Sequence, residues 1–153
     1  MAIDFSEAIV SIVQRERGRL LAMKEEDVSV KPAPDKWSKK EIVGHLIDSA
    51  CNNHQRFIRA QFTDRLDFPG YTGTDWVHCQ GYSDENWQHL VLLWSAFNLH
   101  LAHVISLIPS NKMFVQCKIG ENNLMSLEVL IADYIRHMEH HLKQLNPVSA
   151  LTI

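Results

Sequence analysis

Three histidines have the residue type and the spacing of a metal site. His137 and His141 lie four positions apart in a segment with helical periodicity, and His45 lies near the start of another such segment. Residues at i and i+4 share one face of a helix, so two imidazoles there can bind one ion. A third histidine from a facing helix would leave one coordination position open, as in catalytic zinc sites. The sequence therefore predicts a three-histidine site for a divalent metal.

The surroundings of the paired histidines favour this interpretation over an ordinary buried histidine. His137 and His141 fall within an apolar stripe that includes Tyr134 and Met138. A buried imidazole without a hydrogen-bond partner is costly, and one metal ion would remove that cost for both side chains. His140 is rotated by about 100° from His141 on the helix, so we expect it to lie outside the site.

A line of polar residues accompanies His45 on its helix. Asp48, Asn52 and Arg56 all fall within about 60° of His45 when successive residues are rotated by 100°. One interpretation is a solvated face with an Asp48–Arg56 pair. The other is a polar line facing a cleft, in which Asp48 orients a ligand or acts as a general base. Arg56 would then hold a substrate carboxylate.

Four segments with helical periodicity must position these residues. They cover about 4–23, 38–61, 83–108 and 126–145, and Ser38 with Glu41 forms a capping box at the start of the second. Four amphipathic helices predict an all-α four-helix bundle. If the second and fourth helices are antiparallel, His45, His137 and His141 come to the same end of the bundle.

Two connections in the predicted bundle are longer than a turn. Residues 63–81 are predicted to form a long glycine-containing loop after the second helix, with Tyr71 and Trp76 at the mouth of the site. The alternative is that these two aromatic residues cap the core. Residues 113–123 predict a short hairpin before the fourth helix.

Composition limits the classes of function. The chain has 153 residues and a formal net charge of −3, which fits one domain over 1–153 and argues against a nucleic-acid partner. No apolar run suggests a membrane span, and the first residues do not resemble a signal peptide. Three widely spaced cysteines are typical of free thiols in a cytoplasmic protein.

Three sequence segments together resemble the DinB/YfiT-like superfamily. They are the run Trp37–Ser49, the pair Arg56–Phe57 and the run His137–Leu142, and the resemblance extends over nearly the whole chain. It implies a four-helix bundle with a helix crossover, often as a homodimer. It also implies zinc or nickel on His45, His137 and His141, with water completing the coordination.

The resemblance implies a class of activity without identifying the reaction. Related proteins include metal-dependent hydrolases and S-transferases or isomerases that use a low-molecular-weight thiol. The leading hypothesis is therefore a metal-dependent enzyme acting on a small molecule. The competing hypotheses are a non-catalytic metal- or ligand-binding bundle and a helical bundle dimer without metal.

Overall fold

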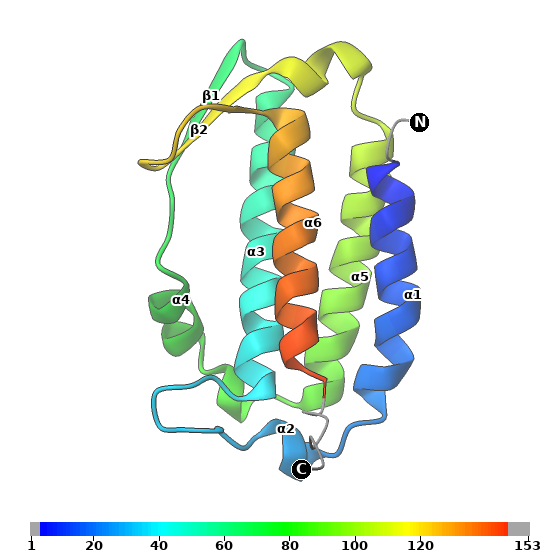
Figure 1. The fold of residues 1–153 in the computed structure, drawn as a ribbon, viewed down its shortest axis with the longest axis vertical. Helices are drawn as coiled ribbons and strands as arrows, with labels where there is room; N and C mark the ends of the chain where they lie inside the picture. The colour runs from blue at the N-terminus through cyan, green and yellow to red at the C-terminus, as the bar shows by residue number, and fades with distance from the viewer. Residues whose placement is uncertain (1–3, 147–153) are drawn as a thin grey trace, which may run out of the picture.

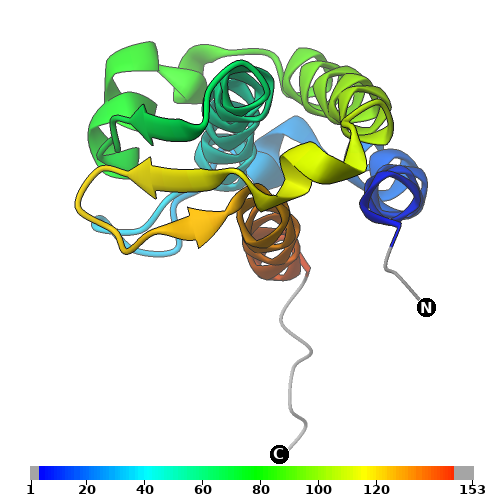
Figure 2. The ribbon, with the colours of Figure 1, turned by 90° about the horizontal axis from the view of Figure 1, so that it is seen from above.

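The chain folds as the predicted four-helix bundle, with a small three-stranded sheet on one side. The computed structural model describes residues 4–146 (Figure 1). The bundle consists of α1 (Phe5–Leu21), α3 (Lys39–Ala60), α5 (Trp87–Ser106) and α6 (Leu127–Gln144). Each helix packs against two others, because contacts run from α1 to α5, α5 to α3, α3 to α6 and α6 back to α1 (Figure 2). Helices α3 and α6 are antiparallel, which confirms the arrangement that the histidines required (Figure 1).

Side-chain caps determine where the bundle helices begin. The hydroxyl of Ser38 accepts a hydrogen bond from the Glu41 backbone N–H, and the Glu41 carboxylate accepts one from Ser38, so the predicted capping box is confirmed. The start predicted at Ser83 is wrong. Residues Tyr82–Asp84 form a short 3-10 turn, η1, and α5 begins after Asn86, whose side chain accepts a hydrogen bond from the backbone N–H of His89.

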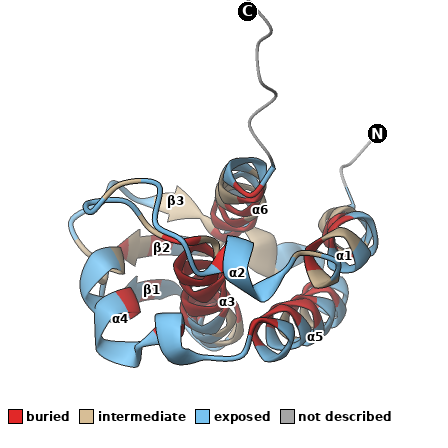
Figure 3. Cartoon of the chain, turned by 90° about the horizontal axis from the view of Figure 1, so that it is seen from below, coloured by how far each residue is buried: buried red, intermediate tan, exposed pale blue. Residues whose placement is uncertain are grey.

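The core lies along the axis of the bundle, where the buried positions of all four helices meet (Figure 3). Its largest fully buried side chains include Phe57 on α3, Trp87 and Trp94 on α5, and Met138 on α6. Burying a large apolar side chain contributes about 1.5–3 kcal/mol relative to leaving it exposed. The helices therefore hold their relative positions through apolar packing that is separate from the histidines.

The connections are more structured than the sequence predicted. A short helix, α2 (Glu25–Val28), lies between α1 and α3. After α3, the segment predicted as an irregular loop contains β1 (Arg65–Phe68) and α4 (Gly73–Gln80). A 3-10 turn, η2 (Ser110–Phe114), leads into β2 (Gln116–Ile119), which pairs with β3 (Met125–Ser126) in antiparallel fashion and confirms the hairpin. Strand β1 pairs with β2 in parallel, with Arg65 opposite Gln116. The sheet thus joins the start of the α3-to-α5 connection to the α5-to-α6 connection beside the bundle (Figure 2).

Helix α5 is more apolar than expected. Among residues 4–146 it is the one helix that is long and apolar enough to cross a membrane, judged by length and composition alone. The expectation that no apolar run is as long as a membrane span is therefore wrong. A core helix passes the same test, and α5 packs against α1 and α3 with Trp94 and Leu101 fully buried.

Candidate metal centre

The three predicted histidines meet between α3 and α6. His45, His137 and His141 each place one ring nitrogen in a common cluster, and these three nitrogens lie within 4.8 Å of one another. The Nε2 atoms of His45 and His137 are 3.1 Å apart. Two nitrogens bound to one tetrahedral zinc at 2.0–2.1 Å are separated by roughly 3.3 Å, so this spacing suits a shared ion.

The ring of His141 is oriented by a neighbour on its own helix. Its Nδ1 lies 3.0 Å from Oε1 of Gln144. An amide oxygen accepts, so this contact fits the tautomer in which Nδ1 carries the proton and Nε2 keeps its lone pair for a metal. Metal-binding histidines characteristically donate their second ring N–H in this way. In contrast, the Nδ1 atoms of His45 and His137 are buried and have no hydrogen-bond partner among residues 4–146.

Burial and mutual repulsion keep the histidines neutral. The pKa of His45 is lowered to about 4, mainly by burial and to a smaller extent by repulsion from His137 and His141. The pKa of His137 is also lowered to about 4, mainly by burial and to a smaller extent by repulsion from His141 and His140. Burial also lowers the pKa of His141, although the hydrogen bond with Gln144 opposes the shift. Metal ions bind the neutral imidazole, so at pH 7 the folded protein presents its ligands in the required state.

Trp37 and Gly73 pack around the histidine ligands. The ring of Trp37 lies 4.8 Å from that of His45 and 6.4 Å from that of His141, measured between centroids. On the other side, Gly73 begins α4 so close to His45 that an added Cβ would lie 3.1 Å from its Cε1 atom. The first turn of α4 can approach the ligand this closely because residue 73 has no side chain.

The polar line on α3 is buried, which excludes the solvated-face interpretation. His45, Asp48, Asn52 and Arg56 are 8%, 2%, 8% and 7% exposed. No ion pair joins Asp48 and Arg56 among the described residues. Asp48 and Arg56 contact different parts of the chain.

Asp48 connects α3 to the segment that carries α4. Its Oδ1 accepts hydrogen bonds from the Tyr82 hydroxyl at 2.6 Å and from Nε2 of Gln80 at 2.7 Å. Burial raises the pKa of the Asp48 carboxyl, and these two hydrogen bonds oppose the shift. No described hydrogen bond joins Asp48 to a histidine ring. Its predicted action as a general base or ligand-orienting group remains a prediction.

Gly44 allows this connection to form. A Cβ on Gly44 would lie 2.1 Å from the Tyr82 ring, so the ring packs directly on the backbone of α3. This contact delivers the hydroxyl of Tyr82 to Asp48, one turn further along the helix. The residues Gly44, Tyr82 and Gln80 therefore hold the end of α4, while Gly73 places its start on His45.

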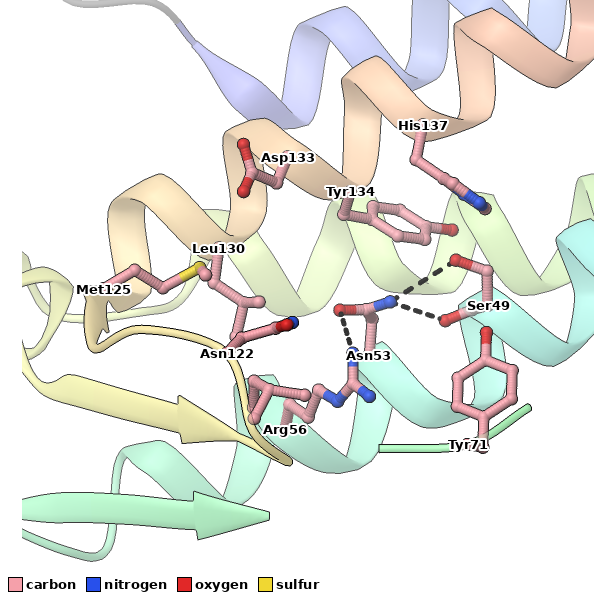
Figure 4. A pocket seen from close by; sticks show the side chains of 11 residues that line it. Ser49, Asn53, Arg56, Tyr71, Asn122, Met125, Leu130, Asp133, Tyr134 and His137 are labelled. Carbon is pink, nitrogen blue, oxygen red and sulfur yellow. Dashed lines mark hydrogen bonds between the residues drawn. The ribbon is translucent and has the colours of Figure 1, made fainter. Parts of the chain in front are cut away.

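Arg56 lines a cavity that also reaches His137. The cavity has a volume of about 270 Å³ and lies between α3, α6 and the hairpin (Figure 4). Tyr71 also lines it, so the prediction that segment 63–81 reaches the site is confirmed for this residue. Trp76 packs on Tyr71, with 5.0 Å between ring centroids. A second cavity, of about 520 Å³, is lined by Trp37 and His141.

The donor set fits a divalent transition metal. Imidazole nitrogen suits zinc and nickel, and among the described residues the group that converges consists of three histidines without an acidic residue. His140 is exposed and is not part of that cluster, as expected from its rotation. A cavity beside His137 gives a small molecule access to the ligands.

The sequence reasoning missed the supporting residues. Trp37 entered the prediction only as the first residue of the run Trp37–Ser49, and Gln80, Tyr82 and Gln144 were not assigned to the site. Gly44 gave the one available signal, because a glycine within a helix costs about 1 kcal/mol relative to alanine and often reflects close packing. Nothing in the sequence indicated which side chain would approach it.

Comparison with known proteins identifies the family and supports the fold. A model of the DinB superfamily matches residues 13–145, and the chain belongs to that superfamily. No curated protein matches the sequence.

One similar solved structure is YfiT from Bacillus subtilis, which is described as "a probable metal-dependent hydrolase with an unusual four-helix bundle topology". The TM-score is 0.79 at 14% identity, over 90% of this chain and 79% of that one. This likeness supports the fold.

Proposed function

We propose that this protein is a metal-dependent enzyme of the hydrolase or thiol S-transferase type, with zinc or nickel held by His45, His137 and His141. The observation that carries the proposal is the convergence of three imidazoles within 4.8 Å beside a cavity. Three protein ligands leave a position for water or substrate, which is the arrangement of catalytic rather than structural sites.

The bound metal would lower the pKa of water or of a thiol and so supply a nucleophile near neutral pH. The protein residues provide the remaining parts of the site. Gln144 holds the His141 ring in the tautomer with a free Nε2. Trp37 packs beside two of the imidazoles. Asp48, held by Tyr82, keeps α4 against the site, and we retain it as a candidate proton acceptor.

The finer features of this proposal follow from the family resemblance. A low-molecular-weight thiol is a candidate co-substrate, and the second cavity beside Trp37 and His141 has the volume for a small molecule. A homodimer in the cytoplasm is the expected state, and Leu92, Leu93 and Leu99 form exposed apolar positions on α5.

Cobalt substitution tests whether the coordination is open. Protein purified without a histidine tag is analysed for metal, loaded with cobalt and titrated with azide and with 2-mercaptoethanol while the visible spectrum is recorded. We expect about one metal per chain and a spectral shift as the exchangeable ligand is replaced. Cobalt binding without any shift would indicate a closed site and favour the non-catalytic metal-binding bundle.

Turnover provides the second arm of the test. Metal-loaded protein is assayed with activated esters and with a thiol plus an alkylating electrophile. His141→Ala serves as the metal-deficient variant, and His140→Ala as the matched control. Activity that survives in the His141→Ala protein would contradict the proposal.

A further inference from the structure

The cavity beside His137 is lined by polar residues on one side and by a mixture of apolar and polar residues on the other (Figure 4). Helix α3 and the segment before α4 contribute Ser49, Asn53, Arg56 and Tyr71. The hairpin and α6 contribute the apolar residues Ile119, Met125 and Leu130, together with Asn122, Asp133, Tyr134 and His137. A cavity of about 270 Å³ lies at the small end of the range for ligand pockets, so its occupant is a small molecule.

Arg56 is a buried cation without an anionic partner. It is 7% exposed, its Nε atom is buried without a hydrogen-bond partner, and no carboxylate lies within ion-pair distance among residues 4–146. Its nearest polar partner is Oδ1 of Asn53, 3.5 Å from Nη1. The rings of Phe68 and Tyr71 flank the guanidinium at 5.5 and 5.9 Å from its carbon.

An unpaired buried charge is expensive, and arginine does not escape the cost by losing its proton. Cation–π contacts with Phe68 and Tyr71 offset part of it. The remaining donors of the guanidinium are available to a ligand, and their planar fork matches a carboxylate. The cavity that Arg56 lines leads to His137, so a molecule bound to Arg56 extends toward the metal ligands.

The charge balance of the cavity favours a single negative charge. Asp133 lines the same cavity and is ion-paired with Arg136, so the net charge added by Arg56 is about one unit. A dianion such as phosphate would leave one charge unmatched beside Asp133. The apolar residues Met125 and Leu130 suit hydrocarbon between the charged group and the reacting bond.

We propose that the substrate is a small organic carboxylate whose carboxylate group binds Arg56 while its reacting bond lies at the histidine cluster. This inference rests on the proposed function and specifies its substrate class. His45 and Arg56 lie on one face of α3 and are separated by roughly 16 Å along the helix at 1.5 Å per residue. The substrate therefore has several carbon atoms between its carboxylate and the bond that reacts.

The experiment compares hexanoate with hexanamide, which has the same length and no charge. Binding to the full chain is measured by calorimetry with the protein metal-loaded and again after chelation, and inorganic phosphate is titrated as a third probe. We expect hexanoate to bind roughly ten- to a hundredfold more tightly than hexanamide, in line with hydrogen bonds to a charged group. The preference should persist after chelation, because it resides in Arg56.

Two variants assign the preference to Arg56. Arg56→Gln should abolish it, and Arg56→Lys should restore part of it, because lysine keeps the charge but lacks the planar fork. Arg59→Gln is the matched control, since Arg59 is exposed on the same helix and bonds to Gln55. Thermal denaturation checks that each variant is folded.

Several outcomes would overturn the inference. Equal binding of hexanoate and hexanamide, tighter binding of phosphate, or a preference that survives in Arg56→Gln would each do so. A preference that disappears on chelation would place the carboxylate on the metal and leave the proposed function intact. Conversely, Arg56-dependent binding in a protein that takes up no metal would sustain the carboxylate subsite and refute the metal-dependent enzyme.

Discussion

Removal of the metal should lower the melting temperature without unfolding the protein at room temperature. A metal bound to the folded state alone stabilises it by about 4 kcal/mol when its concentration is a thousandfold above the dissociation constant. The entropy of unfolding is about 2.1 cal/mol/K per residue, so for 153 residues it is about 0.3 kcal/mol/K. Dividing one by the other gives a fall in melting temperature of about 13 °C.

The structure explains why the chelated protein should remain folded. The histidines lie between α3 and α6, whereas the core that joins all four helices includes Phe57, Trp87 and Trp94, each fully buried. Losing the metal removes none of this apolar packing. A structural zinc site behaves differently, because its domain unfolds without the ion.

Scanning calorimetry with zinc and then with excess chelator measures the effect. The His141→Ala protein should melt at the chelated temperature whether or not zinc is added, and His140→Ala should behave like the unaltered chain. Equal melting temperatures with and without zinc would refute the metal site. Complete unfolding on chelation would show that the metal is structural and weaken the proposed enzyme.

Three further predictions concern residues around the site. The free energy of unfolding of the chelated protein should fall by about 2–3 kcal/mol as pH decreases from 6.5 to 4. The reason is that the unfolded chain protonates His45 near pH 6.5, whereas the folded chain does so only near its pKa of about 4. Urea titrations at each pH measure this, with His45→Gln as the control, and an equal loss of stability in both proteins would contradict it. Gly44→Ala should cost about 1–3 kcal/mol in urea unfolding, because its Cβ would lie 2.1 Å from the ring of Tyr82, whereas Gly18→Ala in open space should not destabilise the protein. Gly73→Ala should weaken zinc affinity in a chelator competition while leaving stability nearly unchanged, because its Cβ would press on His45 at 3.1 Å; unchanged affinity would show that the ring moves freely.

The ligand set was predictable because helical periodicity places residues in space. His137 and His141 are on one face through their spacing alone, and His45 joins them because α3 and α6 are antiparallel. The capping box at Ser38 set the start of α3 and thereby the height of His45 in the bundle. Local chemistry and one assumption about helix direction were sufficient for this part of the site.

The parts that could not be predicted depend on contacts between distant residues. The pairing of β1 with β2 joins Arg65 to Gln116. Both strands alternate polar and apolar residues, but four residues are too few for this alternation to be a strong signal. The bond between Tyr82 and Asp48 spans 34 positions, and α4 is a short helix whose position depends on it. The helical wheel also treated Asp48 and Arg56 as one polar line, whereas they contact different parts of the chain.

The separation of these two charges explains how one helix can serve both sides of a site. Asp48 faces α4 and is held by Tyr82, so its charge helps to place the segment that covers His45. Arg56 lies two turns further along α3 and lines the cavity leading to His137, where no described carboxylate neutralises it. An interior selected for stability alone would pair or replace such a cation, because an unpaired buried charge costs more than an apolar side chain of similar volume. The position of Arg56 is therefore understandable if its partner arrives with the substrate.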